Sequence, residues 1–162
     1  MAEPLRAHAA APLLAGGRIL VVEARYYETI GAMLLEGAEA AIAASGATME
    51  AIGVPGALEI PGAIAIALDA ADAVGLPYDG AVALGCVVRG ETFHFEIVAG
   101  ESARALMELS VAERLALGNG ILTVDTLAQA EERADPRRGD KGGDAARAAL
   151  ALAALKRKLD VS

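Results

Sequence analysis

Short apolar runs rich in strand-forming residues alternate along this chain with longer runs rich in alanine and leucine. Four short runs have the length and composition of buried strands, namely Arg18–Arg25, Thr48–Val54, Gly80–Val88 and Gly120–Asp125. The third is apolar on both faces, which suits a central strand covered by helices on each side. Strands that alternate with helical segments are typical of parallel sheets joined by helical crossovers.

The longer runs carry helical signals. Side chains from Ile30 to Ser45 repeat at helical spacing, and Gly46 follows as a helix end. Further helices are expected at Gly62–Ala73, at Phe93–Leu117, after a capping box that begins at Thr126, and from about Asp144, where Leu152, Leu155 and Leu159 share one stripe. We therefore predict a three-layer α/β/α sandwich with a four-stranded, doubly wound (flavodoxin-like) parallel sheet. Residues 18–160 are expected to form one domain, preceded by a flexible arm at residues 1–17.

Composition narrows the function classes. The chain has 162 residues, 55% of them apolar, which excludes disorder and collagen-like structure. A net charge of -8 argues against nucleic-acid and anionic-membrane partners, and no apolar run approaches the roughly 20 residues of a membrane span. The single cysteine, Cys86, forms no internal disulfide, and no Cys/His cluster has structural zinc spacing. We expect a cytoplasmic protein without a metal site.

Aromatic residues gather where predicted strands end. Four of the five rings in the chain follow the first and third strands, as Tyr26, Tyr27, Phe93 and Phe95. His94 lies between the two phenylalanines, and an unperturbed imidazole exchanges protons near neutral pH. The alternative is that the rings plug an aliphatic core and the histidine has a structural partner. The clustering favours a flat ligand with His94 as the acid–base group.

Three further features point to ligand binding. Gly90–Thr92 forms a strand-to-helix turn whose N–H groups and positive helix end suit a phosphate. Glu59 lies between two prolines after the second strand, where it either stabilises a helix N-terminus or accepts ligand hydroxyls. Arg133 and Lys141 are scarce cations of an acidic chain; they form a solvated face or reach a phosphate or carbonyl on their own or a neighbouring subunit.

Five motifs, in this order, resemble the lumazine synthase family from about Arg18 to Leu159. They are Ala24-Arg-Tyr-Tyr27, Pro55-Gly-Ala-Leu-Glu-Ile-Pro61, Gly85-Cys-Val-Val-Arg-Gly-Glu-Thr-Phe-His-Phe-Glu96, Gly120-Ile-Leu-Thr-Val-Asp-Thr126 and Lys141-Gly142. The resemblance implies condensation of 5-amino-6-ribitylamino-uracil with 3,4-dihydroxy-2-butanone 4-phosphate. The product would be 6,7-dimethyl-8-ribityllumazine, formed with loss of phosphate and water in the penultimate step of riboflavin biosynthesis. It also implies that neither a metal nor an organic cofactor is needed.

The same resemblance implies a role for each matching position. His94 matches the proton-transfer residue, and Tyr26 matches the ring that stacks on the pyrimidine. The other expected substrate contacts are Ala57, Leu58 and Glu59 along the ribityl chain, Val87 and Val88 at the pyrimidine edge, Gly90, Glu91, Thr92 and Arg133 around the phosphate, Lys141 at the heterocycle, and Asn119. Two positions depart from the family pattern: Tyr27 replaces a frequent asparagine, and Asn119 replaces a phenylalanine that covers the ligand.

The resemblance further implies a homo-oligomer whose sites lie between subunits. Asn119, Arg133 and Lys141 would come from the adjacent copy. We expect pentamers and, because the segment from Ala134 to Lys141 lacks a blocking insertion, a 60-subunit icosahedral shell. Two alternatives to an active enzyme remain: a catalytically weak paralogue that binds a flavin or lumazine, and a paralogue whose purpose is the shell.

Overall fold

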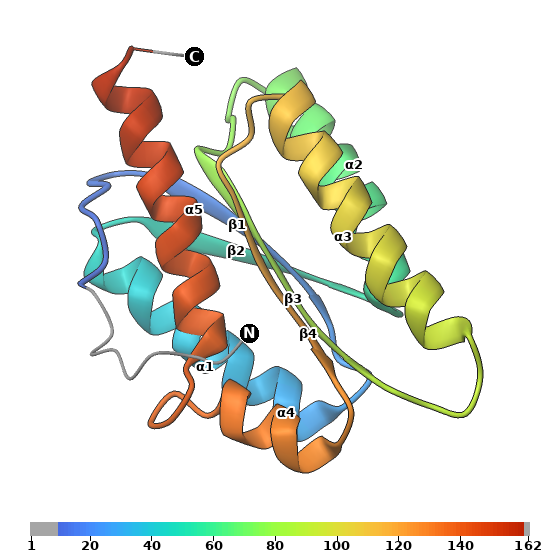
Figure 1. Cartoon of the computed structure of the whole chain (residues 1–162). Helices are drawn as coiled ribbons and strands as arrows, with labels where there is room; N and C mark the ends of the chain where they lie inside the picture. Colours follow the sequence, from blue (N-terminus) through green and yellow to red (C-terminus); the bar gives the residue numbers. More distant parts are fainter. Residues whose placement is uncertain (1–9, 161–162) are drawn as a thin grey trace.

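The computed structural model describes residues 10–160. Its four strands are separated along the chain by helices (Figure 1). The elements are β1 (Arg18–Ala24), α1 (Glu28–Ala44), β2 (Thr48–Val54), the 3-10 helix η1 (Ala57–Glu59), α2 (Ile60–Ala73), β3 (Gly80–Val88), α3 (His94–Ala112), β4 (Leu117–Val124), α4 (Leu127–Ala134) and α5 (Lys141–Lys158). All strand pairs are parallel, in the order β2-β1-β3-β4. The predicted three-layer α/β/α class is confirmed.

The sheet separates two apolar clusters, because successive side chains of a strand point to opposite faces. Helices α1, α4 and α5 cover one face, and α2 and α3 cover the other (Figure 1). The first cluster is formed around Ile19, Val21, Leu34, Ile42, Val82 and Leu150. The second is formed around Leu20, Val22, Ile60, Ile64 and Leu106. The carboxyl ends of all four strands therefore open between the two helical layers.

The largest differences from the predicted boundaries are at the end of α3, the start of β4, predicted at Gly120, and the start of α5. Helix α3 ends at Ala112 and β4 begins at Leu117, although the helical pattern extends to Leu117. Arg114 takes a left-handed conformation with φ of 51°, which ends the helix, and Leu117 then pairs with Ala81 of β3. Helix α5 begins at Lys141 rather than Asp144.

Glycines explain the early start of α5. A Cβ atom built at Gly142 would lie 2.7 Å from the carbonyl carbon of Leu34 in α1, closer than any side chain permits. A Cβ at Gly118 of β4 would meet the carbonyl carbon of Ala145 in α5 at the same distance. Residues that read as helix breakers in the sequence thus allow α5 to pack backbone against backbone. This contact fixes the position of Lys141, the first residue of α5.

Part of the expected N-terminal arm lies outside the described residues, namely residues 1–9. Within residues 10–17, Leu14 is fully buried and its N–H donates to the carbonyl of Ser45 at 2.8 Å. The guanidinium of Arg157 donates to the carbonyl of Ala15 at 3.0 Å. Across residues 10–160, no helix has both the length and the apolar character needed to cross a membrane.

Candidate functional site

The ends of β1, β2 and β3 bring most of the expected site residues to one edge of the sheet. Ala24 pairs with Val54 at the end of β2, and β3 runs beside β1 in parallel register. The segments that follow these strands carry Tyr26 after β1, residues 57–59 as η1 after β2, and Gly90, Glu91 and Thr92 after β3. Helix η1 contacts both β3, whose last residues are 87 and 88, and α3. Segments distant in sequence therefore meet here because the sheet is parallel.

The two tyrosines after β1 play different structural parts. Tyr26 is 77% exposed, and its ring meets that of Tyr27 edge to face, with 5.0 Å between centroids and an interplanar angle of 73°. Tyr27 packs against the first core cluster, and burial, together with the nearby Cys86 and Tyr26, raises the pKa of its hydroxyl. Tyr27 anchors the pair, and Tyr26 presents an exposed ring suited to stacking on a flat ligand.

The turn between β3 and α3 places His94 at the first position of a 19-residue helix. Residues 90–94 are exposed, and a Cβ at Gly90 would meet no atom within 4 Å. The N–H of His94 donates to Oγ1 of Thr92 across a long 3.4 Å. An imidazole therefore lies next to N–H groups at the positive end of a helix dipole. This arrangement suits the binding of an anion next to a group that is able to transfer protons.

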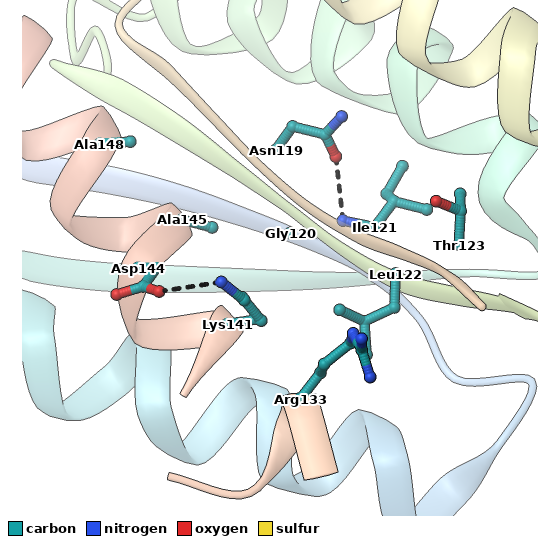
Figure 2. A pocket seen from close by; sticks show the side chains of 10 residues that line it. All are labelled: Asn119, Gly120, Ile121, Leu122, Thr123, Arg133, Lys141, Asp144, Ala145 and Ala148. Carbon is teal, nitrogen blue, oxygen red and sulfur yellow. Dashed lines mark hydrogen bonds and ion pairs between the residues drawn. The ribbon is translucent and has the colours of Figure 1, made fainter. Parts of the chain in front are cut away.

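A pocket of about 400 Å³ lies on the β4 side of the molecule, between β4, α4 and α5 (Figure 2). It contains three of the expected site residues, Asn119, Arg133 and Lys141. Oδ1 of Asn119 accepts the N–H of Ile121 at 2.9 Å, and Nη1 of Arg133 donates to a carbonyl of its own helix at 3.1 Å. Nζ of Lys141 lies 3.5 Å from Oδ2 of Asp144. Two cations thus line one concave surface.

The expected site residues therefore fall into two groups within a single chain. Among the residues described, none of the strand-end residues, including Tyr26, Glu59 and His94, lines the pocket of Asn119, Arg133 and Lys141. These three are the residues that the family resemblance assigns to an adjacent copy.

Sequence reasoning missed two charged side chains beside these groups. Asp144 lines the pocket and pairs with Lys141, a contact that the three-residue helical spacing signals. Arg89 pairs with Asp125 and Glu96 at the carboxyl end of the sheet. Its partner Asp125 is 36 positions away, so this contact becomes visible only when β3 and β4 are known to be neighbours.

Neither a metal cluster nor a reactive thiol is found in the described part of the chain. No group of three His, Cys, Asp or Glu side chains among residues 10–160 could hold a metal ion. Burial raises the pKa of the Cys86 thiol to about 11, so the thiol is uncharged at neutral pH.

Comparison with known proteins connects this geometry to one family. Residues 16–157 match the family model described as 6,7-dimethyl-8-ribityllumazine synthase. A protein of that name from Methylocella silvestris is 70% identical over 144 residues, which cover 89% of this chain and 88% of that protein. "6,7-dimethyl-8-ribityllumazine synthase 1" of Rhodopseudomonas palustris strain CGA009 is 63% identical over 90% of both chains. The protein of R. palustris strain BisA53 is 59% identical over 98% of both chains. The chain belongs to the 6,7-dimethyl-8-ribityllumazine synthase family.

Proposed function

We propose that this protein is a transferase that condenses 5-amino-6-ribitylamino-uracil with 3,4-dihydroxy-2-butanone 4-phosphate to 6,7-dimethyl-8-ribityllumazine, the penultimate step of riboflavin biosynthesis. The observation that best supports this proposal is the exposed imidazole of His94 beside the Gly90–Thr92 turn at the N-terminus of α3, in a chain of this family. In such an arrangement the N–H groups of the turn bind the phosphate of a substrate, and the imidazole transfers protons near it. We place the reaction in the cytoplasm.

The chemistry consists of imine formation, phosphate elimination and ring closure. The amine at position 5 of the pyrimidine attacks the ketone carbonyl and water leaves. The carbon that bears the 3-hydroxyl then loses a proton and the neighbouring carbon loses inorganic phosphate, which leaves an enol that tautomerises to a new ketone. Attack of the ribitylamino nitrogen on this new ketone closes the ring and releases a second water. His94 moves protons in these steps, and the N–H groups of Gly90, Glu91 and Thr92 hold the phosphate.

The remaining contacts orient the pyrimidine, and positioning supplies much of the acceleration. Tyr26 stacks on the ring, and the Val87–Val88 backbone meets its edge. Ala57, Leu58 and Glu59 line the ribityl chain, whose hydroxyls donate to the Glu59 carboxylate. Side-chain cations complete the site: Arg133 at the phosphate and Lys141 at the heterocycle. Asn119 hydrogen-bonds the bound ligand in place of a covering ring.

The completing residues are proposed to come from a neighbouring copy in a homopentamer, with a 60-subunit icosahedral shell as the larger assembly. Two observations support a homo-oligomer. The pocket of Asn119, Arg133 and Lys141 is separate from the strand-end group within one chain. Large apolar side chains are also exposed on α2 and α3, including Ile66 at 73% and Val111 at 73%, which is more typical of an interface than of free surface.

The two-substrate assay on purified protein tests the function. The parent should form the fluorescent lumazine well above the uncatalysed background. His94→Ala should lower kcat by about 10²- to 10⁴-fold with little change in product affinity, because the imidazole acts on protons rather than on binding. A parent that binds the lumazine but gives only the background rate would instead identify a binding or shell-forming paralogue.

A mixing experiment tests the location of the site. His94→Ala and Arg133→Ala copies, each inactive alone, are co-expressed at equal amounts and purified as one assembly. If each site uses His94 from one copy and Arg133 from its neighbour, about a quarter of the sites are intact in a random ring. Activity of the mixture near a quarter of the parent value is expected, and a mixture as inactive as its components would show that one chain holds the whole site.

A further inference from the structure

We propose that Arg89 is a positioning residue that holds the phosphate-binding turn, residues 90–93, against the end of the sheet. The inference rests on the proposed function, because it concerns the same turn and the adjacent His94. It assigns a role to a side chain that the site described above does not use.

Arg89 connects three elements around the turn. Its N–H donates to the carbonyl of Val124 at 2.8 Å, which continues the pairing of β3 and β4 by one residue. Its Nε donates to Oδ1 of Asp125 at 2.9 Å, and its Nη1 donates to Oε1 of Glu96 at 2.7 Å. The guanidinium carbon also lies 4.4 Å from the ring centroid of Phe95. One side chain therefore joins β3 and the end of β4 to the first turn of α3.

The turn has few attachments of its own. Residues 90–93 are exposed, and the hydrogen bonds they make in the described structure stay local: Thr92 to His94, and the carbonyl of Phe93 to the next turn of α3. Arg89 instead holds both ends of the turn. It directly precedes the turn in the chain, and its side chain contacts Glu96 and Phe95 in the first turn of α3, where the turn ends. The spacing between the N–H groups of the turn and His94 consequently depends on Arg89.

The charges indicate positioning rather than direct attraction of the phosphate. The hydrogen bonds that Arg89 donates to Asp125 and Glu96 raise the pKa of Arg89, and the bond to Glu96 lowers the pKa of that carboxyl. The guanidinium is therefore matched by two carboxylates. Because its planar fork reaches both at once, a lysine at this position would reach only one of them.

The exposure of the Arg89 side chain indicates that it contributes little to the stability of the fold. The Arg89 side chain is 49% exposed and its partners are similarly open, and exposed ion pairs contribute little to stability. Removing the guanidinium should loosen the turn while leaving the cores intact. The expected signature is a selective defect in phosphate-dependent steps at nearly unchanged thermal stability.

Steady-state kinetics of the assembled protein test the proposal. Arg89→Met should raise the KM for the butanone phosphate by about 10-fold and leave the KM for the pyrimidine within about 2-fold, since only the phosphate turn is released. The midpoint of thermal unfolding should change by less than about 3 °C. Arg89→Lys should resemble Arg89→Met. Asp125→Asn and Glu96→Gln should each give a smaller rise, and neither should add to Arg89→Met.

A matched control comes from helix α3, whose first turn Arg89 contacts. Arg104 also pairs with two carboxylates, Glu101 at 2.7 Å and Glu108, and is similarly exposed on α3. Arg104→Met should leave both KM values unchanged.

In the kinetic and unfolding measurements, three outcomes would overturn the positioning role: equal rises in both KM values, a parent-like Arg89→Lys, or a large fall in the unfolding midpoint with the kinetic defect. Binding of inorganic phosphate, measured by calorimetry, distinguishes this failure from failure of the proposed function. If the parent shows no turnover, the proposed function is wrong. Weaker phosphate binding by Arg89→Met than by the parent would still support the positioning role of Arg89. Equal phosphate binding by the parent and Arg89→Met would overturn it.

Discussion

Replacing Gly142 with alanine tests whether backbone-to-backbone packing places the first turn of α5. The new Cβ would lie 2.7 Å from the carbonyl carbon and 2.9 Å from the Cα of Leu34. Carbon atoms pack no closer than about 3.5 Å without repulsion, and the carbonyl oxygen of Leu34 would lie still closer to the new Cβ. Helices α1 and α5 must therefore separate by at least about 0.8 Å at this point. Neither contact involves a flexible side chain that could turn aside.

The cost follows from the packing. Forcing an extra methyl group into a filled interior costs about 1–3 kcal/mol, and the better helix propensity of alanine returns less than about 1 kcal/mol near a helix start. We expect a net loss near 2 kcal/mol, which lowers the unfolding midpoint by about 4–8 °C in a chain of this size. Lys141 precedes the substituted residue, and a displacement approaching 1 Å should lower kcat/KM by about 10- to 100-fold.

Thermal unfolding and the two-substrate assay, both at one fixed protein concentration, measure these effects. The matched control is Gly100→Ala in the middle of α3, where an added Cβ meets no described atom within 4 Å. That variant should be as stable as the parent or up to about 1 kcal/mol more stable. If Gly142→Ala keeps the parent midpoint and activity, close backbone packing does not place Lys141.

Two further predictions concern single side chains. Burial raises the pKa of the Cys86 thiol to about 11, so at pH 8 this thiol should react with iodoacetamide about 100-fold more slowly in the folded protein than in denaturant. The reaction of the folded protein should become faster only as the pH approaches 11. Equal rates in the folded and denatured protein would contradict the burial of Cys86. Nη2 of Arg147 lies 2.9 Å from Oδ2 of Asp140 and 2.7 Å from Oδ1 of Asp144, with Arg147 and Asp140 side chains only 16% and 10% exposed. Arg147→Met should therefore cost about 3 kcal/mol in urea unfolding, whereas Arg137→Met on the surface should cost less than about 0.5 kcal/mol, and similar midpoints for both would refute the buried pair.

The sequence predicts the elements whose signals are local. The capping box at Thr126 is an example: Oγ1 of Thr126 accepts the N–H of Gln129 at 3.2 Å, and α4 begins at the next residue. The strand ends that carry Tyr26 and His94 were also predictable, because a parallel sheet places such ends together. The end of α3 was not, since the left-handed backbone at Arg114 interrupts a pattern that continues to Leu117.

Contacts between segments that are distant in the chain could not be predicted from the sequence. Gly142 and Gly143 weaken a helix by propensity, so α5 was expected to start after them, and only the close approach of α1 explains why they belong to it. The pairing of Arg89 with Asp125 depends on which strands are neighbours. The grouping of Asn119 with Arg133 and Lys141 depends on β4, α4 and α5 lying next to one another.

The glycine contacts of α5 bear on how this fold can be redesigned. An interface made of side chains absorbs a substitution by repacking, but the approach of Gly118 to Ala145 leaves nothing to rearrange. Volume can be redistributed in the layer of α2 and α3, where Ile64 and Leu106 belong to one cluster of buried side chains, without shifting α5. A designer who seeks a different substrate could therefore treat the start of α5 as a fixed reference point and vary the opposite layer.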